Sequence, residues 1–474
     1  MTRSTHCACT SILVGKKASL DGSTMIARTE DNTHACMPKR FVVTPAQTYH
    51  KERFTSANNG FTCELNGEGL SYTATPEIDS SAGMYEEAGI NAAGVAMSAT
   101  ESTYANERVL AHDPLVENGL AEDSLVSVVL PFITTAREGI ARIADIIATH
   151  GSAESNSILL ADAREVWYME LATGHHWVAQ RIPDNSYAVC SNRISIQKVN
   201  FKSDDFCSSV GIREFVDEHQ LNPRPKTFDF RRIFGTYTQQ DTHYNTPRVW
   251  YGQRLFSSDA AQQPEDLNLP FIRRADRLLG VDDVTQLLGS HFEGTAFDPL
   301  GADGDKHTRT RYRSIALSRT QEGHVLQLRA DLPPDRAGIH WVSLATTAFS
   351  PFVPFFANAT QAHPAWESTA DRPDPKSTYW LLRTLSMLTE NRYELAARTV
   401  DDYLTTCRQK AHAFVAATDR DTTSLSDTAL TTALTDANNA FMAEILADTR
   451  AVLQDVIMAA AEDSRLSFDM DTNL

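Results

Sequence analysis

Two cysteines lie close together near the beginning of the chain, at positions 7 and 9 of the segment MTRSTHCACTSILV. A thiol that loses its proton becomes a strong nucleophile and can attack a peptide or amide carbonyl. If the chain is cleaved after Ala8, Cys9 also carries a free α-amine. An unperturbed α-amine has a pKa of roughly 7.7–8.0, so near pH 7 part of it can accept the thiol proton. Position alone favours a buried packing cysteine, because cysteine is among the most buried residue types.

A nucleophile of this kind needs a cation to favour the thiolate, a carboxylate to orient the amine and donors for the oxyanion. The pattern predicts a β-hairpin, with strands over Cys9–Val14 and Ser23–Arg28. Such a hairpin brings Arg28, and Asp31 just beyond the second strand, back beside the thiol. Taken alone, these two residues fit a surface ion pair, which contributes little to stability. Beside the thiol they supply the cation and the carboxylate.

A metal site is the rival interpretation of the first segment, because His6, Cys7 and Cys9 are followed by His34 and Cys36. Paired cysteines in zinc sites usually have two or more residues between them, and here there is one. We therefore expect no metal and no cofactor. The first cysteine lacks the Thr-Ser pair and the strand that follow the second, so we expect it to leave with a leader of residues 1–8. The other five cysteines are interpreted as ordinary packing residues.

Composition limits the setting more than the activity. The chain of 474 residues has 43 Lys and Arg against 61 Asp and Glu, a formal charge of −18, which repels nucleic acid and anionic lipid. Seven cysteines, an odd number without a dense pattern, favour a reducing compartment. No run approaches the ~18 apolar residues of a membrane span, and the start lacks a secretory apolar region. We expect a cytoplasmic protein without nucleic-acid or membrane partners, and no enzyme class is excluded.

The first 200 residues predict strands, then helices, then strands again. A helix is expected over Arg137–Thr149, where isoleucines recur at helical spacing and Gly151 can cap the end. Ser157–Ala161 and Glu165–Leu171 are typical of a hairpin. This order predicts a mainly antiparallel sheet with helices packed outside it, an α+β fold.

The rest of the chain divides into a polar middle and a helical end. Residues 200–335 are expected to be irregular, with short helices near Ser209–Glu218 and Val284–Leu288. Helical patterns then cover Thr378–Thr389, Tyr393–Ala416 and Thr428–Asp463. We expect this last region to form part of a homo-oligomer surface.

Several segments resemble known hydrolases. The run CTSILVGKKASLDGSTMIARTEDN, Cys9–Asn32, resembles the start of the N-terminal-nucleophile hydrolases of the choloylglycine hydrolase and penicillin V acylase group, which begin Cys-Thr and carry Arg-x-x-Asp on the second strand. It is more similar still to their dipeptidase A-type relatives. Further similar segments follow in the expected order: Gly89–Ser102, Cys190–Ile196, Pro247–Phe256, His291–Asp298 and Val353–Phe356.

The resemblance implies a four-layer αββα sandwich over residues 9–375, with a helical C-terminal region of residues 376–474 packed on it. It implies a cysteine dipeptidase that hydrolyses short peptides through a thioester. One alternative is an amidase for N-acyl or bile-salt-like amides. Another is a non-catalytic interaction protein that retains the fold.

The resemblance also assigns roles to residues. Cys9 matches the nucleophile, Arg28 the arginine beside the thiol, and Asp31 the aspartate that holds the α-amine. Asn192 matches an asparagine that donates to the oxyanion. A second active-site arginine corresponds to Arg248 or, with a shifted register, to Arg254.

One position departs from the acylase pattern. Glu101 stands where those enzymes carry an asparagine after a Gly-Val-Ala strand. An ionised carboxylate cannot donate to an oxyanion, but it can bind the α-ammonium of a short peptide, which favours an exopeptidase. Further on, the basic cluster Arg309–Arg313 could bind a substrate carboxylate or pair with Asp303 and Asp305.

Overall fold

The structure is a computed structural model, and it describes residues 9–34, 36–100, 103–258 and 261–463. Two antiparallel sheets face each other. In spatial order the first sheet contains β14 (Ile272–Arg273), β12 (Tyr187–Cys190), β1 (Thr10–Val14), β2 (Thr24–Asp31), β15 (Thr320–Leu328), β16 (Gly338–Leu344) and β17 (Val353–Phe356). The second sheet contains β13 (Phe206–Ser208), β11 (Trp177–Ile182), β10 (Val166–Leu171), β9 (Asn156–Ala161), β8 (Ala96–Thr100) and β7 (Ala88–Ile90).

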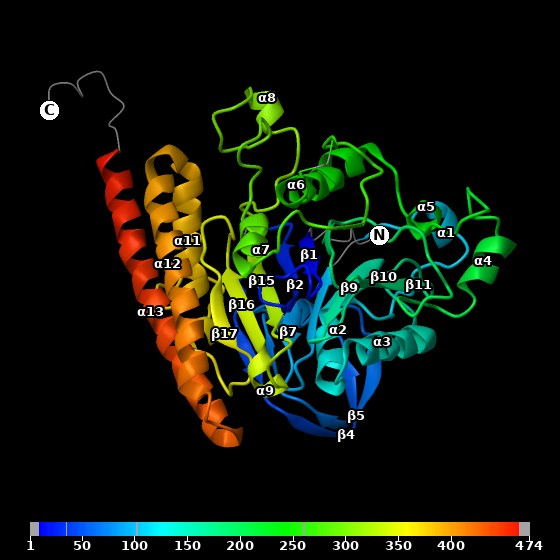
Figure 1. Cartoon of the computed structure of the whole chain (residues 1–474), viewed down its shortest axis with the longest axis horizontal. Coiled ribbons are helices and arrows are strands. Elements are labelled where there is room, and N and C mark those ends of the chain that lie inside the picture. The colour runs from blue at the N-terminus through cyan, green and yellow to red at the C-terminus, as the bar shows by residue number, and fades with distance from the viewer. Residues whose placement is uncertain (1–8, 35, 101–102, 259–260, 464–474) are drawn as a thin grey trace.

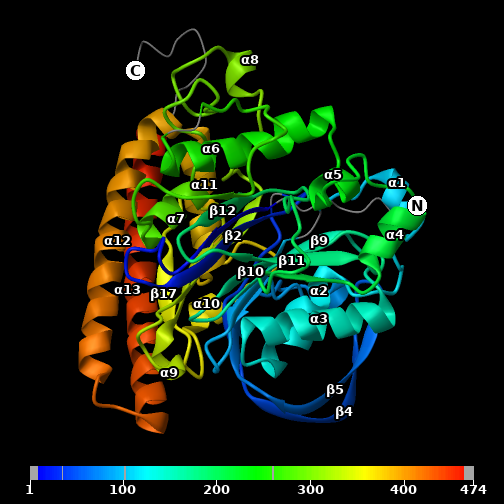
Figure 2. The same cartoon turned by 45° about the vertical axis from the view of Figure 1, so that its right-hand side comes forward.

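Helices cover the outer face of each sheet. The helices α2 (Glu122–Val129) and α3 (Ala136–His150) pack on the six-stranded sheet. The seven-stranded sheet is covered by α6 (Thr246–Phe256), α7 (Val281–Leu288), α11 (Thr378–Asn391), α12 (Tyr393–Thr422) and α13 (Asp427–Glu462). Figure 2 shows the layers in turn, from α6 through β2 and β10 to α3, and Figure 1 shows the three C-terminal helices stacked beside β16 and β17. The predicted αββα sandwich is confirmed.

Shorter elements complete the described chain. The strands outside the two large sheets are β3 (Val42–Thr44), β4 (Gln47–Thr55), β5 (Thr62–Gly69) and β6 (Tyr72–Ala74). Its short helices are α1 (Glu107–Leu110), α4 (Ile212–Glu218), α5 (Phe230–Phe234), α8 (Lys306–Arg309), α9 (Pro334–Ala337) and α10 (Pro364–Glu367), with η1 (Ser80–Ala82), η2 (Leu130–Phe132) and η3 (Asp241–Asn245). The β4–β5 hairpin lies on the outer side of the six-stranded sheet, where Tyr49 contacts Phe132 of η2 (Figure 1).

The predicted first hairpin is formed by β1 and β2, with Ser11 opposite Arg28. Side chains alternate between the two faces of a strand. Leu13 and Ile26 therefore pack between the two sheets, whereas Ile12 and Ala27 face the outer helices. The second strand is longer than predicted, since it continues to Asp31.

The helical predictions are also confirmed. The helix α3 ends at Gly151, whose φ of 72° is a conformation that glycine adopts without strain. The three C-terminal helices share one hydrophobic core with the sheet, in which Leu382 and Ile445 join Phe355. This core fixes the helical region on the sandwich.

The prediction of an irregular middle is wrong in two places. Residues 320–328 form β15, which lies in the centre of the seven-stranded sheet between β2 and β16. Its sequence, TQEGHVLQL, looks exposed because Glu322 and His324 are polar, yet both are fully buried between the sheets. The helix α6, which carries Arg248, was not predicted either.

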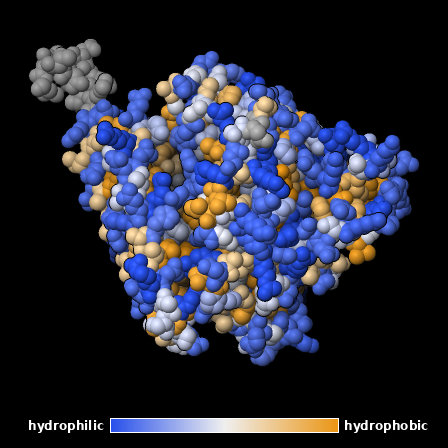
Figure 3. Space-filling model, viewed as in Figure 1, coloured by the Kyte–Doolittle hydropathy of each residue, from blue (hydrophilic) through white to orange (hydrophobic). Residues whose placement is uncertain are grey.

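On the face drawn in Figure 3, polar side chains predominate and apolar ones form small separate patches. Scattered patches of this kind are normal for a folded protein surface. Within the described ranges, no helix is both long and apolar enough to cross a membrane.

Candidate active site

Cys9 lies immediately before β1 and is fully buried. Its Sγ accepts a hydrogen bond from Nη1 of Arg28 at 3.2 Å. Burial raises the pKa of the Cys9 thiol far above its usual range, while the charge of Arg28 lowers it and that of Glu122 raises it. Burial thus favours the protonated thiol, and attack on a carbonyl needs a base that takes the thiol proton.

Arg28 is held on three sides. Its Nε donates to Ser98 Oγ at 2.9 Å, and its Nη2 donates to Glu87 Oε2 at 2.5 Å. Glu122 Oε1 lies 3.5 Å from Nη1. Burial alone would lower the pKa of Arg28, but the surrounding negative charges, Glu87 above all, raise it well above its usual value. The guanidinium beside the thiol is thus a permanent cation.

Other buried charged and polar groups lie next to the hydrogen-bond partners of this arginine. Lys39 Nζ lies 3.1 Å from Glu87 Oε1 and 3.0 Å from Glu30 Oε2. On the other side, Ser98 Oγ lies 2.9 Å from His324 Nε2, whose Nδ1 lies 3.0 Å from Glu322 Oε1. These contacts surround Arg28 with groups that restrict its position.

Asp31 lies on the opposite face of the same strand. Its carboxylate accepts hydrogen bonds from Arg313 Nη2 and Thr320 Oγ1. The backbone nitrogen of Cys9, a peptide nitrogen while Ala8 precedes it, donates instead to Asn192 Oδ1 at 3.2 Å. Contact between Asp31 and a free α-amine remains a prediction.

Arg248 joins Asn192 to the backbone of Cys9. Its Nη1 donates to the Cys9 carbonyl oxygen at 2.5 Å, and its Nη2 donates to Asn192 Oδ1 at 2.8 Å. Because arginine only donates, this contact fixes which end of the Asn192 amide is the carbonyl and sets Nδ2 as its donor end. Burial, with a smaller effect of Arg313, lowers the pKa of Arg248 to about 9, so it is still charged near pH 7.

The remaining predicted residues fall into three groups. Arg254 is exposed and lies over Trp250, 5.8 Å from the ring centre, so Arg248 is the arginine that reaches Cys9. Glu101 and Cys7 lie outside the described residues. The predicted pairing of the basic cluster with Asp303 and Asp305 is wrong. Arg313 binds Asp31, Arg309 donates to the carbonyl oxygen of Gly301, and Arg311 donates to Glu265.

The other cysteines are only partly as predicted. Cys190 and Cys407 are buried, and Cys63 and Cys207 are partly buried against the core of the six-stranded sheet. Cys36 is exposed, so its interpretation as a packing residue is wrong. All six cysteines of the described chain are free thiols.

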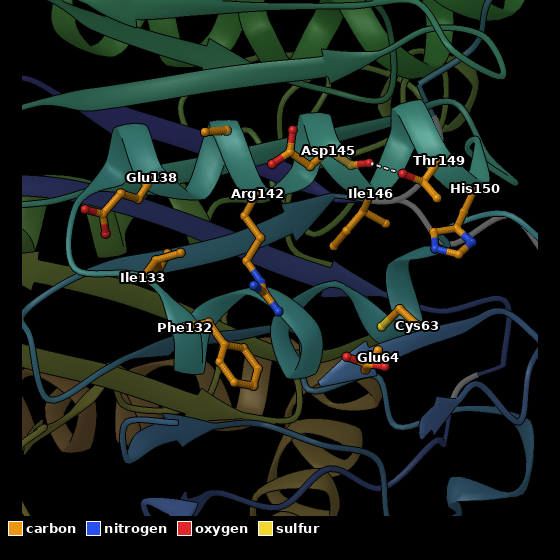
Figure 4. A pocket seen from close by; sticks show the side chains of 11 residues that line it. Cys63, Glu64, Phe132, Ile133, Glu138, Arg142, Asp145, Ile146, Thr149 and His150 are labelled. Atoms are coloured by element: carbon orange, nitrogen blue, oxygen red, sulfur yellow. Dashed lines mark hydrogen bonds between the residues drawn. The ribbon is translucent and has the colours of Figure 1, made fainter. Parts of the chain in front are cut away.

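Of two cavities in the described chain, one borders the residues around Cys9 and the other does not. A groove of about 470 Å³ lies between β5 and α3, lined by Cys63, Phe132 and Arg142 among others (Figure 4). It contains none of the residues around Cys9, since it is on the outer side of the six-stranded sheet. A second pocket, of about 330 Å³, is lined by Arg313, the residue whose guanidinium binds Asp31.

The prediction from sequence missed several groups in contact with the site. One signal was present for Ser98, a polar residue at an inward position of the apolar strand β8. No short motif links the other missed residues to the cysteine, because distant segments supply them: Glu87, Glu122, Lys39 and Arg313.

Comparison with known proteins identifies the family of the chain. The family model described as "Peptidase family C69" matches residues 8–406 of this chain. A "Probable dipeptidase" of Latilactobacillus sakei is 46% identical over 468 residues, 98% of each chain. "Dipeptidase A" of Lactobacillus helveticus is 35% identical over 436 residues, 91% of this chain and 92% of that one. The solved penicillin V acylase of Agrobacterium tumefaciens is 11% identical, with a TM-score of 0.30, over 73% of this chain and 86% of that one. The chain belongs to peptidase family C69.

Proposed function

We propose that this protein is a cysteine dipeptidase, and that Cys9 is its nucleophile. The observation that carries the proposal is the buried Cys9 thiol, which lies 3.2 Å from the guanidinium of Arg28. The names of the two relatives support the substrate class, since one is a "Probable dipeptidase" matched over 98% of this chain and the other is "Dipeptidase A" matched over 91% of it.

The first half of the proposed reaction needs the α-amine of Cys9. Removal of residues 1–8 frees this amine, which accepts the thiol proton. The thiolate then attacks the scissile carbonyl, so that a carbon–sulfur bond forms and the carbonyl oxygen becomes an oxyanion. Nδ2 of Asn192 donates to this oxyanion, and Arg28 favours the thiolate. The α-ammonium passes its proton to the departing amine as the carbon–nitrogen bond breaks, which leaves a thioester.

Water completes the cycle. The same α-amine takes a proton from a water molecule, which attacks the thioester carbonyl. The carbon–sulfur bond breaks, the α-ammonium returns its proton to the thiolate, and the amino acid leaves as a carboxylic acid that releases its proton to the solvent. The β1–β2 register pairs Thr10 with Thr29 and so places Asp31 beside the N-terminal end of β1, which supports its role in orienting the amine.

The amino end of the substrate is assigned by chemistry. Glu101 is proposed to bind the α-ammonium of the dipeptide, since a carboxylate is a suitable partner for that charge. Replacing Glu101 by Gln should reduce hydrolysis of free dipeptides more than hydrolysis of N-blocked amides. An equal loss for both substrates would show that Glu101 does not read the free amine.

Two measurements test the proposed function: the intact mass, which shows where the chain begins, and the hydrolysis of dipeptides. Intact mass of the purified enzyme should show a chain that begins at Cys9. Purified wild type should hydrolyse dipeptides, and Cys9→Ser should lose this activity by several orders of magnitude while its melting temperature stays within a few degrees. Full activity in Cys9→Ser would overturn the proposal.

We also propose the cytoplasm as the compartment and a homo-oligomer as the working form. The free thiols of the described chain support a reducing compartment.

Four exposed apolar side chains support self-association through the C-terminal helices: Met387, Leu395, Ile457 and Met458. Light scattering coupled to size exclusion should give a mass above that of one chain, and replacing Ile457 and Met458 by Glu should lower it.

A further inference from the structure

Glu87 is buried between two cations of the site. Its carboxylate lies 2.5 Å from Arg28 Nη2 through Oε2 and 3.1 Å from Lys39 Nζ through Oε1. The side chains of Arg28 and Lys39 are 0% exposed and that of Glu87 is 2% exposed. One carboxylate therefore holds two cations at a fixed separation, away from water.

The backbone at this point is unusual as well. Glu87 has a φ of 59° and Tyr85 a φ of 43°, in the left-handed region that residues other than glycine rarely adopt. This conformation lets the Glu87 carbonyl oxygen accept a second hydrogen bond from Arg28 Nη2, at 3.3 Å. Lys39 Nζ also donates to the Tyr85 carbonyl at 3.3 Å. The strained turn thus directs both the carbonyl and the carboxylate of Glu87 toward one nitrogen of Arg28.

Fixing two sides of a guanidinium determines where its third side points. The group is planar and rigid, so its donors cannot move independently. Glu87 holds Nη2 and Ser98 holds Nε, which leaves Nη1 directed at the thiol of Cys9. Glu122 lies farther away, 3.5 Å from Nη1, and contributes charge more than direction.

We propose that Glu87 is a positioning residue that holds the guanidinium of Arg28 against the thiol of Cys9. This inference rests on the proposed role of Cys9 as the nucleophile. Glu87 touches neither the thiol nor the peptide in this account, and it acts only through Arg28.

Two effects of Glu87 on the thiol have opposite signs, which makes the proposal testable. The negative charge of Glu87 by itself raises the pKa of Cys9, whereas Arg28 lowers it. If Glu87 acted only as a nearby charge, removing that charge would make the thiol more acidic. If Glu87 positions Arg28, disturbing the contact weakens the effect of Arg28 and makes the thiol less acidic.

The experiment compares Glu87→Asp, Glu87→Gln and Glu122→Gln with wild type. Asp keeps the charge but is too short for the 2.5 Å contact, and Gln keeps the length but loses the charge. Glu122→Gln is the matched control, because it removes a carboxylate that lies farther from the same guanidinium, 3.5 Å from Nη1. Iodoacetamide alkylation is followed from pH 6 to pH 10 on the proteins as purified. Peptide mass spectrometry isolates the Cys9 signal from the other thiols, and intact mass confirms that all variants share one N-terminus.

The proposal predicts alkylation of Cys9 slower by about tenfold or more at a fixed pH in Glu87→Asp, and slower alkylation in Glu87→Gln. Glu122→Gln should instead alkylate as fast as wild type or faster. An unchanged rate in Glu87→Asp would overturn the proposal, as would a faster rate in Glu87→Gln. If Glu87→Gln does not fold, Glu87→Asp still decides the matter, since the buried cations keep their negative partner.

The same variants separate this inference from the proposed function. Glu87→Asp should lower kcat for a dipeptide by about tenfold while KM changes less than about twofold, because the thiol and not the binding site is affected. If Cys9→Ser retained hydrolysis while Glu87→Asp still slowed alkylation, the proposed function would fail and the positioning role would stand.

Discussion

Arg28 and Asp31 lie on the same strand, three residues apart, and their side chains point to opposite faces of the seven-stranded sheet. Arg28 reaches Ser98 between the two sheets, and Asp31 reaches Arg313 on the outer side. The odd spacing follows from the alternation of side chains along a strand. One strand therefore presents Arg28 to the thiol on its inner face and Asp31 near the end of the neighbouring strand on its outer face.

The charge of Arg28 is not sufficient for its proposed role; the geometry matters as well. Arg28→Lys keeps the cation but cannot contact Glu87, Ser98 and the thiol together. We expect dipeptide hydrolysis to fall by about tenfold or more and Cys9 alkylation to slow in parallel. Thermal unfolding should be measured alongside. Wild-type hydrolysis in Arg28→Lys would contradict a geometric role.

Asn192 should be needed as a donor and not only as an acceptor. Asn192→Asp preserves the oxygen that accepts from Arg248 and Cys9, but it removes Nδ2. We expect kcat to fall by about 10²–10³, as for loss of one oxyanion donor. Steady-state kinetics and thermal unfolding give the test. A loss confined to KM would argue that Asn192 binds substrate and does not stabilise the oxyanion.

Arg248 and Arg254 form a natural pair for comparison, since both are on α6 and only the first reaches Cys9. Arg248→Ala leaves the Cys9 carbonyl and Asn192 without their buried donor, and we expect a loss of activity of at least about tenfold. Arg254→Ala should stay within about twofold of wild type, because its side chain is exposed. Equal effects of the two substitutions on dipeptide hydrolysis would contradict this assignment.

Much of the fold could be predicted from the sequence because it depends on local patterns. The β1–β2 hairpin, α3 and the C-terminal helices all follow from apolar periodicity, and Cys9, Arg28 and Asn192 come together as the resemblance implied. The central strand β15 escaped prediction because its buried positions hold Glu322 and His324, which contact each other, and His324 also contacts Ser98 of a distant strand. The place of Glu87 depends on a tertiary contact with Arg28 that no local pattern records. The division of the chain near residue 375 remains a prediction.

A buried carboxylate outside the site, that of Glu170, should make stability depend on pH. Glu170 is fully buried and accepts the backbone N–H groups of Ser195 and Ile196, and burial raises its pKa from 4.5 to about 8. The folded state therefore holds the proton more tightly than the unfolded state. Its free energy of unfolding should fall as pH rises from about 4.5 to about 8, by on the order of a few kcal/mol from this group.

Glu170→Gln cannot titrate and is the control for this effect. Urea unfolding of both proteins at several pH values should show that the variant lacks this part of the slope, even though it loses one hydrogen bond at every pH. Parallel pH dependences of wild type and variant would show that another group is responsible.

The central claim is that the peptide is cleaved through a thioester on Cys9, and trapping that intermediate tests it most directly. A dipeptide is mixed with the enzyme, the reaction is quenched in acid within its first turnovers, and the N-terminal peptide is analysed by mass spectrometry. We predict a peptide that begins at Cys9 and carries the mass of the N-terminal aminoacyl group of the substrate on its sulfur, absent from Cys9→Ser. Rapid hydrolysis by an enzyme whose Cys9 peptide never carries this group, or by one that still has residue 8 attached, would contradict the account.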